Sequence, residues 1–270
     1  MNLYGWKKDP YDPRAVSYAS LPQIKRLLKK VEGIPSERDM KKFLPPNVPW
    51  NQLGKGHCVG FGEGMNLTMR AVEQKVYDKI KQRFSPEWIV DGAQELEGST
   101  GHDYGCYPTD GWLWLMQHGC LLESFYPYTE KVLKKKPSTL GLDKEALKWP
   151  MGSNFIRVDD GIDGIKLSLA AWNPISIGTP WFKKWEDIGK DGILPKVTSR
   201  DEIAGGHETI IFGYLTIKNI EYVEGINSWG DWADNGLFRI PATAFAVMKK
   251  IPAEQGGQYD AQFPLINWRP

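Results

Sequence analysis

The spacing of apolar residues changes near residue 150, and this change most constrains how the chain can fold. In the first half, apolar residues recur at steps of four, three, four and four, at Met65, Met69, Val72, Val76 and Ile80. This spacing predicts one helix over residues 58 to about 83, with a single face toward a core. In the second half, short apolar or β-branched runs predict strands. We therefore expect an α+β chain with a mainly helical lobe over residues 34–150 and a mainly β lobe over residues 151–270.

Shorter patterns predict the other elements of both lobes. Ser85, Pro86 and Glu87 are typical of a helix cap and first turn, and they predict a short helix through Val90. A Gly-rich, polar loop is expected next, and then a helix that Gly119 ends. The loop is predicted over residues 92–107 and the helix over 110–117, with strands over 155–158, 175–178, 208–215, 220–226 and 236–240.

Composition narrows the classes of partner and cofactor. The chain is 41% hydrophobic and 25% charged, with a net charge of +1, so nothing indicates nucleic acid or an anionic membrane as a partner. No apolar run reaches the roughly 18–20 residues that span a bilayer. A zinc site from Cys106, Cys120 and His118 is conceivable, but paired short-spaced ligands are lacking. We therefore expect no metal and no cofactor. The sequence does not indicate an oligomeric state.

The cysteine count bears on the compartment. Three cysteines, an odd and sparse set, argue against a disulfide framework and indicate a reducing compartment or a virus-encoded product made there. The polar first ten residues lack the apolar core of a secretory signal. The expected location is cytoplasmic, or virion-associated for a phage-encoded protein.

Three segments far apart in the chain carry side chains suited to nucleophilic catalysis. Cys58 lies where a Gly-rich loop becomes a helix, and the positive end of the helix dipole stabilises a thiolate there. Gln52 lies six residues earlier and can donate to an oxyanion together with the backbone amide of Cys58. His207 follows two glycines and starts an apolar strand, and Asn227 at the end of another strand can orient its imidazole. As an ordered set these residues predict a cysteine nucleophile with a histidine base.

Several stretches resemble the papain-like cysteine peptidases, from about residue 34 to about residue 240. The segment "NQLGKGHC" resembles that family's glutamine, glycine-rich turn and nucleophilic cysteine, and "FSPEWIVD" the short helix after its central helix. "YGCYPTDGW" and "HGCLLESFYPYTE" are similar to its Gly-Cys loop, next helix and Tyr-Pro-Tyr segment. "GGHETIIFGY" and "INSWGDWADNGLFRI" resemble its histidine and asparagine strands. The intervals of 149 residues from Cys58 to His207 (207−58) and 169 to Asn227 (227−58) reach or exceed the roughly 130–150 typical of the family.

This resemblance implies a fold and an activity. A helical left lobe would carry Cys58, a β-barrel-like right lobe would carry His207 and Asn227, and a polypeptide substrate would lie in the cleft between them. The chain would be a cysteine endopeptidase acting through a thioester. Gln52 would donate to the oxyanion, Gly206 would contact substrate, and Trp229 would shield the histidine and line the leaving-group side.

The chain departs from the family pattern at several positions. Val59 follows the nucleophile where the family has a large aromatic residue, and Lys55 stands where secreted members have a cysteine that pairs with the position of Cys106. Pro108 and Thr109 replace glycines that pair with the substrate backbone. Another departure is Glu208, which follows the histidine and whose side chain would point away from it. His57 neighbours the nucleophile and is interpreted as a residue of the cleft rim rather than a base.

An N-terminal extension over residues 1–33 is predicted to have an arm over residues 1–20 and an amphipathic helix over 21–31. We expect the helix to pack on the surface rather than block the cleft, because its apolar stripe is narrow and its other face is basic. Two other functions stay open. One is a papain-fold structural or binding protein with weak or lost catalysis, for example as part of a virion. The other is a cell-wall amidase, which the long Cys58–His207 interval and the Asn227 orienter disfavour.

Overall fold

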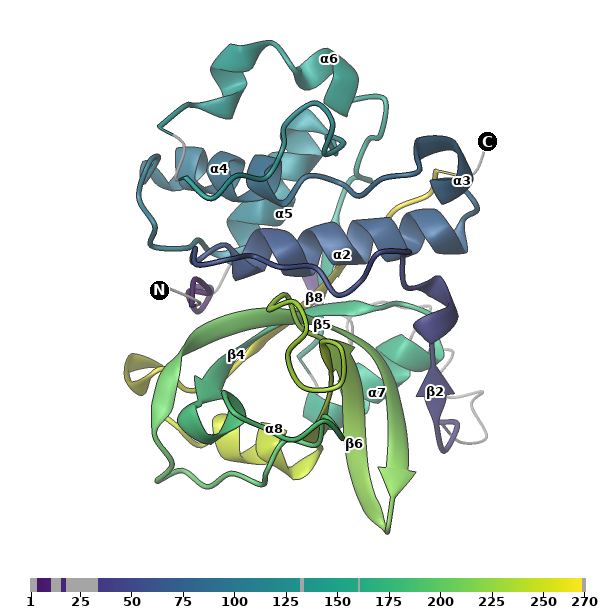
Figure 1. Ribbon diagram of the computed structural model, residues 1–270, viewed down its shortest axis with the longest axis vertical. Helices are drawn as coiled ribbons and strands as arrows, with labels where there is room; N and C mark the ends of the chain where they lie inside the picture. Colours follow the sequence, from purple (N-terminus) through teal and green to yellow (C-terminus); the bar gives the residue numbers. More distant parts are fainter. Residues whose placement is uncertain (1–3, 11–15, 18–33, 132–133, 160, 269–270) are drawn as a thin grey trace.

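A computed structural model describes the chain except for residues 1–3, 11–15, 18–33, 132–133, 160 and 269–270. A group of helices packs above a curved sheet, and helix α2 runs between the two (Figure 1). The expected α+β class and papain-like two-lobe arrangement are confirmed. The amphipathic helix predicted over residues 21–31 lies outside the described residues.

The nucleophile's helix is shorter than its apolar stripe predicts. Helix α2 spans Cys58–Glu73, and a separate short helix, α3, spans Tyr77–Ile80. Between them Lys75 has a φ of 60°, in the left-handed region that an α-helix does not pass through. The apolar periodicity continues across this break because α3 packs into the same core as the second half of α2. One stripe therefore predicted a single helix where the chain forms two.

Two further helices complete most of this lobe. Helix α4 spans Pro86–Glu97, and the Ser85 hydroxyl caps it by accepting the N–H of Trp88 at 3.1 Å. Helix α5 spans Pro108–His118 and ends at Gly119, as predicted. The loop predicted from residue 92 is wrong in its first part, because Gly92 lies inside α4. A Cβ there would come within 2.2 Å of the Trp114 ring, so this glycine allows α4 and α5 to pack closely. A short helix, α6, spans Asp143–Ala146.

In the part of the chain that the structure describes, eight strands form one sheet. Its path runs β1-β3-β8-β4-β5-β6-β7, and β2 pairs with β5 off this path. The sheet is thus open, with β1 and β7 at the ends of the path, rather than closed into a barrel. The bounds are Val16–Ser17 for β1, Arg38–Asp39 for β2, Phe155–Arg157 for β3, Ile175–Phe182 for β4, Ile203–Ile217 for β5, Ile220–Ile226 for β6, Leu237–Pro241 for β7 and Asp260–Pro264 for β8.

The prediction located five of these strands and missed several elements of the β lobe. Strand β6 has the predicted bounds, whereas β4 and β5 extend well beyond theirs. Helices α7, Gly161–Ala170, and α8, Thr243–Met248, were not predicted, and neither was β8. Strand β8 has the sequence DAQFP, whose polar residues hide a strand that is buried at every position.

Two large apolar cores support the cleft from either side. One fills the β lobe, around Trp181, Phe212 and Phe238, and one fills the helical lobe, around Trp88 and Trp112. Helix α2 contributes to both, with Phe61 facing the first core and Leu67 the second. A helix buried on both sides in this way gives Cys58 at its first turn a fixed position.

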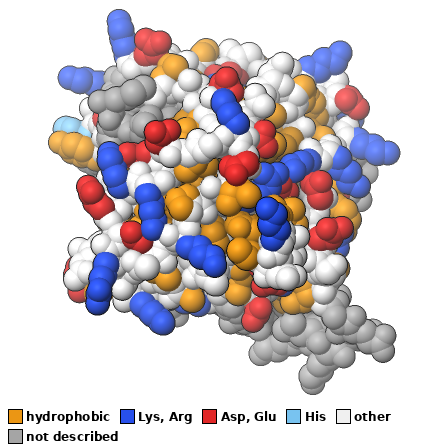
Figure 2. Space-filling view, turned by 60° about the horizontal axis from the view of Figure 1, so that its bottom comes forward, with side chains coloured by type: hydrophobic (Ala, Val, Ile, Leu, Met, Phe, Trp, Pro, Cys, Tyr) orange, Lys and Arg blue, Asp and Glu red, His pale blue; other side chains and the backbone are white. Residues whose placement is uncertain are grey.

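The face of the molecule drawn in Figure 2 shows no single dominant charge. On the face drawn in Figure 2, Lys and Arg side chains alternate with Asp and Glu around a central apolar strip. Within the part of the chain that the structure describes, no helix is long and apolar enough to cross a membrane. Among these residues there is also no cluster of three or more potential metal ligands.

Candidate active site

The candidate nucleophile lies in a covered position. Cys58 is the first residue of α2 and is fully buried. The backbone N–H of Glu208, the residue that follows His207, lies within hydrogen-bonding reach of the thiol, as do those of Gly5 and Trp6. The structure thus brings the nucleophile's helix against the histidine strand. It also brings the N-terminal segment onto the same sulfur atom.

The cover changes the protonation state of the thiol. Burial raises the pKa of Cys58 to about 12, because a thiolate loses its hydration, and the nearby backbone N–H groups offset this only in part. The helix-dipole argument predicted a lowered thiol pKa. That prediction does not hold for this closed arrangement, in which desolvation outweighs the helix terminus.

His207 and Asn227 meet as predicted. His207 lies in β5 and Asn227 directly follows β6, the strand paired with it, and Nε2 of His207 lies 2.7 Å from Oδ1 of Asn227. Because an amide oxygen only accepts, Nε2 carries the hydrogen, and this tautomer places the basic lone pair on Nδ1. Oδ1 of Asn227 also accepts the N–H of Ser228 at 2.7 Å, which fixes the amide.

Aromatic rings enclose this pair. The ring of Trp229 packs on His207 at a centroid distance of 4.7 Å, and Trp181 meets the imidazole edge-on at 4.9 Å. Together with Tyr4 at 6.3 Å they keep the imidazole out of water, and His207 is fully buried. The predicted shielding position of Trp229 agrees with this packing.

Gln52 is held beside the same site. Its backbone N–H donates to the carbonyl of Ser228 at 2.8 Å, and its Oε1 accepts the Ser228 hydroxyl at 2.6 Å. Nε2 donates to the carbonyl of Lys55 at 2.7 Å, closing the turn that leads to the nucleophile. The segment around Gln52 is thereby attached to the residue after Asn227. Gln52, Cys58, His207 and Asn227 thus lie in one region of the structure.

Two residues beside the nucleophile have structural roles. The Lys55 ammonium makes two 2.8 Å contacts with the Glu87 carboxylate, and both side chains are buried. His57 is fully buried, 3.6 Å from Glu87, so its interpretation as a cleft-rim residue is wrong. Burial, the largest cause, lowers its pKa and keeps it neutral. All three cysteines are free. The ion pair of Lys55 with Glu87 therefore joins the loop before Cys58 to α4 in place of a disulfide.

The described part of the N-terminal segment, Tyr4–Pro10, occupies the cleft. The carbonyl of Gly206 accepts N–H groups of Gly5 and Trp6 at 3.2 and 3.1 Å. On the other wall, the backbone N–H of Cys106 donates to the carbonyl of Gly5 at 2.9 Å, and the carbonyl of Cys106 accepts the backbone N–H of Lys7 at 3.2 Å. These two hydrogen bonds form a parallel bridge between Cys106 and Trp6. The segment therefore bridges the two lobes at the nucleophile, as Figure 1 shows for the purple trace between them.

The fit of this segment depends on close backbone approaches. A Cβ at Gly5 would lie 1.6 Å from the carbonyl oxygen of Gly56, and one at Gly105 would lie 1.6 Å from that of Gly5. Thr109 donates its N–H and hydroxyl to Asp9, at 3.1 and 2.7 Å. On this wall, Cys106 thus pairs with the backbone of the segment, and Thr109 binds the Asp9 side chain.

Sequence reasoning missed a group of buried acids beside the cleft. Glu63, Glu208, Asp9 and Asp260 are all buried, although they come from α2, β5, the N-terminal segment and β8. Burial, and then the charge of Asp260, raises the pKa of Asp9 to about 7. Burial also raises the pKa of Glu63 and Glu208 well above their usual range. The unusual Glu after the histidine was the one signal in the sequence.

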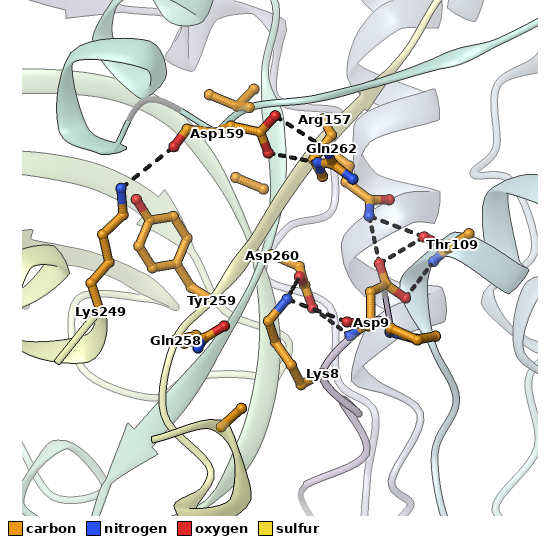
Figure 3. Close-up of a pocket in the computed structure, with 14 residues that line it drawn as sticks. Lys8, Asp9, Thr109, Arg157, Asp159, Lys249, Gln258, Tyr259, Asp260 and Gln262 are labelled. Carbon is orange, nitrogen blue, oxygen red and sulfur yellow. Dashed lines mark hydrogen bonds and ion pairs between the residues drawn. The ribbon is translucent and has the colours of Figure 1, made fainter. Parts of the chain in front are cut away.

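A cavity of about 540 Å³ adjoins this group. Figure 3 shows Asp260 pointing toward Lys8 and the backbone of Asp9, with Thr109 and Gln262 contacting Asp9 from the other side. Lys249 and the Arg157–Asp159 ion pair line the far wall. The cavity is therefore bounded on one side by the N-terminal segment and on the other by the edge of the β lobe.

Comparison with known proteins agrees with this architecture. The family model described as "Papain family cysteine protease" matches residues 50–251, well over half of the chain. The chain belongs to the papain family of cysteine proteases. The matched range contains all of the predicted catalytic residues, from Gln52 to Asn227.

Similar proteins include both solved structures and a curated sequence. The crystal structure of xylellain, a cysteine protease from Xylella fastidiosa, is 21% identical with a TM-score of 0.79, and the match covers 98% of this chain and 97% of that one. Digestive procathepsin L 3 of Tenebrio molitor is 13% identical with a TM-score of 0.66, covering 98% and 76%. A "Cysteine protease" of Blomia tropicalis is 23% identical over 207 residues, or 72% of this chain. The match spans 60% of that relative's length.

Proposed function

We propose that the chain is a cysteine peptidase that hydrolyses peptide bonds with Cys58 as nucleophile and His207 as base. The single observation that carries this proposal is the 2.7 Å contact of His207 with Asn227. It lies next to the nucleophile, because the backbone of Glu208, the residue after His207, meets the Cys58 thiol. Family membership gives the same reaction class.

These residues could hydrolyse a peptide bond in two stages, acylation of Cys58 and hydrolysis of the resulting thioester. His207 takes the thiol proton, and the sulfur attacks the carbonyl carbon of the substrate. The Cys58 backbone N–H and the Gln52 amide stabilise the oxyanion. His207 then gives its proton to the leaving amine as the C–N bond breaks. Water, deprotonated by His207, hydrolyses the thioester and restores the thiol.

We further propose that the conformation described here is latent. The thiol is fully buried and its pKa is raised to about 12, and the backbone of Gly5 and Trp6 lies against the sulfur. The segment therefore covers the nucleophile. Peptides must displace it before they can reach Cys58.

The test is hydrolysis of quenched fluorescent peptides by the full chain and by Gly5→Ala, each with and without Cys58→Ala. We expect Gly5→Ala to cleave peptides faster than the wild type, and Cys58→Ala to abolish cleavage in both. Cleavage that survives Cys58→Ala would refute the assigned nucleophile.

A papain-fold binding protein without catalysis is the second candidate, and the filled cleft with its neutral thiol favours it. It predicts no cleavage in any of the four proteins and no preferential alkylation of Cys58. The buried free cysteines also support a location in a reducing compartment, cytoplasmic or, for a phage-encoded protein, virion-associated.

A further inference from the structure

The side-chain amide of Gln52, the proposed oxyanion donor, is held at both of its polar atoms. Its Oε1 accepts the Ser228 hydroxyl at 2.6 Å, and its Nε2 donates to the backbone carbonyl of Lys55 at 2.7 Å. The amide group is planar and its nitrogen carries two hydrogens, so a contact that fixes one hydrogen also fixes the direction of the other. The position of the Lys55 carbonyl therefore decides where the Gln52 amide points.

Contact with Ser228 alone would not fix this direction. Ser228 belongs to the β lobe, and its carbonyl also accepts the backbone N–H of Gln52 at 2.8 Å. A side chain that is held only at Oε1 can still rotate about that hydrogen bond, and its Nε2 then has no defined direction. Stabilisation of an oxyanion requires donors that are already aimed at the position where charge develops. The second contact, with the Lys55 carbonyl, is thus the one that makes the amide suitable for catalysis.

Lys55 is itself fixed on the helical lobe by its side chain. The residue is charged and yet only 3% exposed. Its ammonium lies 2.8 Å from each carboxylate oxygen of Glu87 and 3.3 Å from the carbonyl of Lys131, and these contacts use all of its hydrogens. Glu87 lies in the first turn of α4 and is fully buried. Such a pair is costly to break, because either partner alone would keep an uncompensated buried charge.

Tyr128 joins this ion pair to Gln52. The Lys55 ammonium lies over the tyrosine ring, 4.4 Å from its centroid, and the tyrosine hydroxyl donates to the backbone carbonyl of Gln52 at 2.6 Å. The ring also packs edge-on against Phe61 of α2, with 4.7 Å between the centroids. Both ends of the turn from Gln52 to Lys55 are therefore attached to one side chain that is packed in the helical lobe.

We propose that Lys55 is a positioning residue for the oxyanion, because its ion pair with Glu87 holds the carbonyl that orients the Gln52 amide. The Lys55 side chain is buried against α4, so it acts through Gln52 and not on the substrate. An ion pair needs no oxidant, so this attachment also forms in a reducing compartment, where a disulfide at the same position would be lost. The inference rests on the proposed peptidase function, which makes Gln52 an oxyanion donor.

The test is a double-mutant cycle on peptide hydrolysis by the full chain in the Gly5→Ala background. One arm is Lys55→Met together with Glu87→Leu, since replacing both partners of a buried ion pair by apolar side chains is often neutral for stability. The other arm is Gln52→Ala. We expect the ion-pair replacement to lower kcat about tenfold with KM nearly unchanged, as part of the roughly 100- to 1,000-fold that loss of one oxyanion donor costs.

The two arms should not be additive. In Gln52→Ala the ion-pair replacement should have little further effect on kcat, because no amide is left to orient. Equal losses of kcat with and without the Gln52 amide would overturn the inference while leaving the peptidase intact. The matched control is Lys190→Met, which removes the lysine of an exposed pair with Asp231 and should leave kcat unchanged.

A second variant tests the same turn without touching the ion pair. Tyr128→Phe removes only the hydroxyl that donates to the Gln52 carbonyl, and the ring can stay packed on Phe61. We expect a smaller loss of kcat than in the ion-pair replacement, again with KM nearly unchanged and again absent in Gln52→Ala. A loss that persists in Gln52→Ala would show that Tyr128 supports the fold and not the orientation of the amide.

The side-chain amide resonances of Gln52 in the isotope-labelled full chain give a readout that needs no hydrolysis, and Gln52→Ala identifies them by their disappearance. The ion-pair replacement should change their chemical shifts, because the Lys55 carbonyl no longer holds one hydrogen, whereas Lys190→Met should not. Changed shifts in a protein that cleaves no peptide, even with Gly5→Ala, would support the orientation of Gln52 by Lys55 and refute the peptidase function. Unchanged shifts would overturn the inference at any rate of hydrolysis.

Discussion

Nε2 of His207 lies 2.7 Å from Oδ1 of Asn227, and this contact fixes which nitrogen can act as base. The pairing of β5 with β6 reaches Ile210 and Ile226, so Asn227, the next residue, lies diagonally across from His207, and Trp229 covers the pair. The pair is thus built by strand pairing and kept out of water before any substrate arrives.

Removal of these groups should have unequal effects on peptide hydrolysis. Cys58→Ala or His207→Ala should lower kcat/KM by roughly three or more orders of magnitude, because each removes a group that the reaction needs. Asn227→Ala should cost less, since the imidazole loses only its orientation. The measurement is kcat/KM of each variant in the Gly5→Ala background. Equal losses in all three would show that Asn227 does more than orient the ring.

A single methyl group in the N-terminal segment should activate the enzyme. In Gly5→Ala the new Cβ would lie 1.6 Å from the Gly56 carbonyl oxygen, so the segment cannot keep its place. Overpacking costs about 1–3 kcal/mol, which shifts the ratio of open to closed molecules by roughly 5- to 150-fold. Initial rates of peptide hydrolysis measure this change.

The matched control for that experiment is Gly189→Ala. Its Cβ would meet only the Asp191 carboxylate, at 3.4 Å, an ordinary contact distance. Its rate should equal that of the wild type. Activation of both variants would show that Gly→Ala loosens the fold in general, whereas no activation of Gly5→Ala would show that the segment does not limit access to Cys58.

Thiol reactivity should change together with activity. Cys58, Cys106 and Cys120 are all fully buried, so iodoacetamide should label the wild type slowly. In Gly5→Ala, Cys58 gains water and lies at the start of α2, so its pKa should fall and its labelling should accelerate. Peptide mapping by mass spectrometry identifies the labelled cysteine. Equal labelling of all three would indicate unfolding rather than opening of the cleft.

The buried Lys55–Glu87 pair should be important for stability. Lys55→Ala leaves the Glu87 carboxylate buried without its ammonium partner, which typically costs about 3–5 kcal/mol. Urea unfolding measures the loss. The control is Lys190→Ala, whose pair with Asp231 is exposed at the surface and should change stability by under about 0.5 kcal/mol. A loss of similar size in both would show that Lys55 is not tied to Glu87 in solution.

The sequence was sufficient to locate the candidate catalytic residues and insufficient for what surrounds them. Cys58, His207 and Asn227 each lie in a local motif, and local motifs survive in a single sequence. Beside the cleft, Glu208, Gly178 and Asp260 come from three strands and become neighbours only through register. Strand β8 was not predicted, so Asp260 could not be placed. The position of Trp6 in the cleft likewise depends on Gly178 and Gly206, which are far apart in the chain.

The same limit explains the errors in the helical lobe. Gly92 is typical of a loop in sequence, although it lies in a helix because its missing side chain leaves room for Trp114. The long apolar stripe hid the break at Lys75, since both helices face one core. In each case a tertiary contact decided the local structure.

Latency should weaken as the pH rises from about 4 to 7. The pKa of Asp9 is about 7 in the seated segment, against an ordinary value of 3.8, because the site is buried and faces Asp260, and the hydrogen bonds from Thr109 and Gln262 compensate only in part. Below about pH 4 Asp9 is protonated in both states and seating carries no penalty. Between these values the released segment ionises and the seated one does not, so release becomes favourable until the penalty levels off above pH 7.

The measurement is the ratio of the wild-type rate to the Gly5→Ala rate across this range, since the pH dependence of the chemistry cancels in the ratio. We expect the ratio to increase with pH in the wild type and to stay nearly flat in Asp9→Asn, which has no charge to gain. A ratio that falls as the pH rises would mean that Lys8, rather than Asp9, governs the seating of the segment. Such a result would require the ion pair with Asp260 to outweigh the burial of both carboxyl groups.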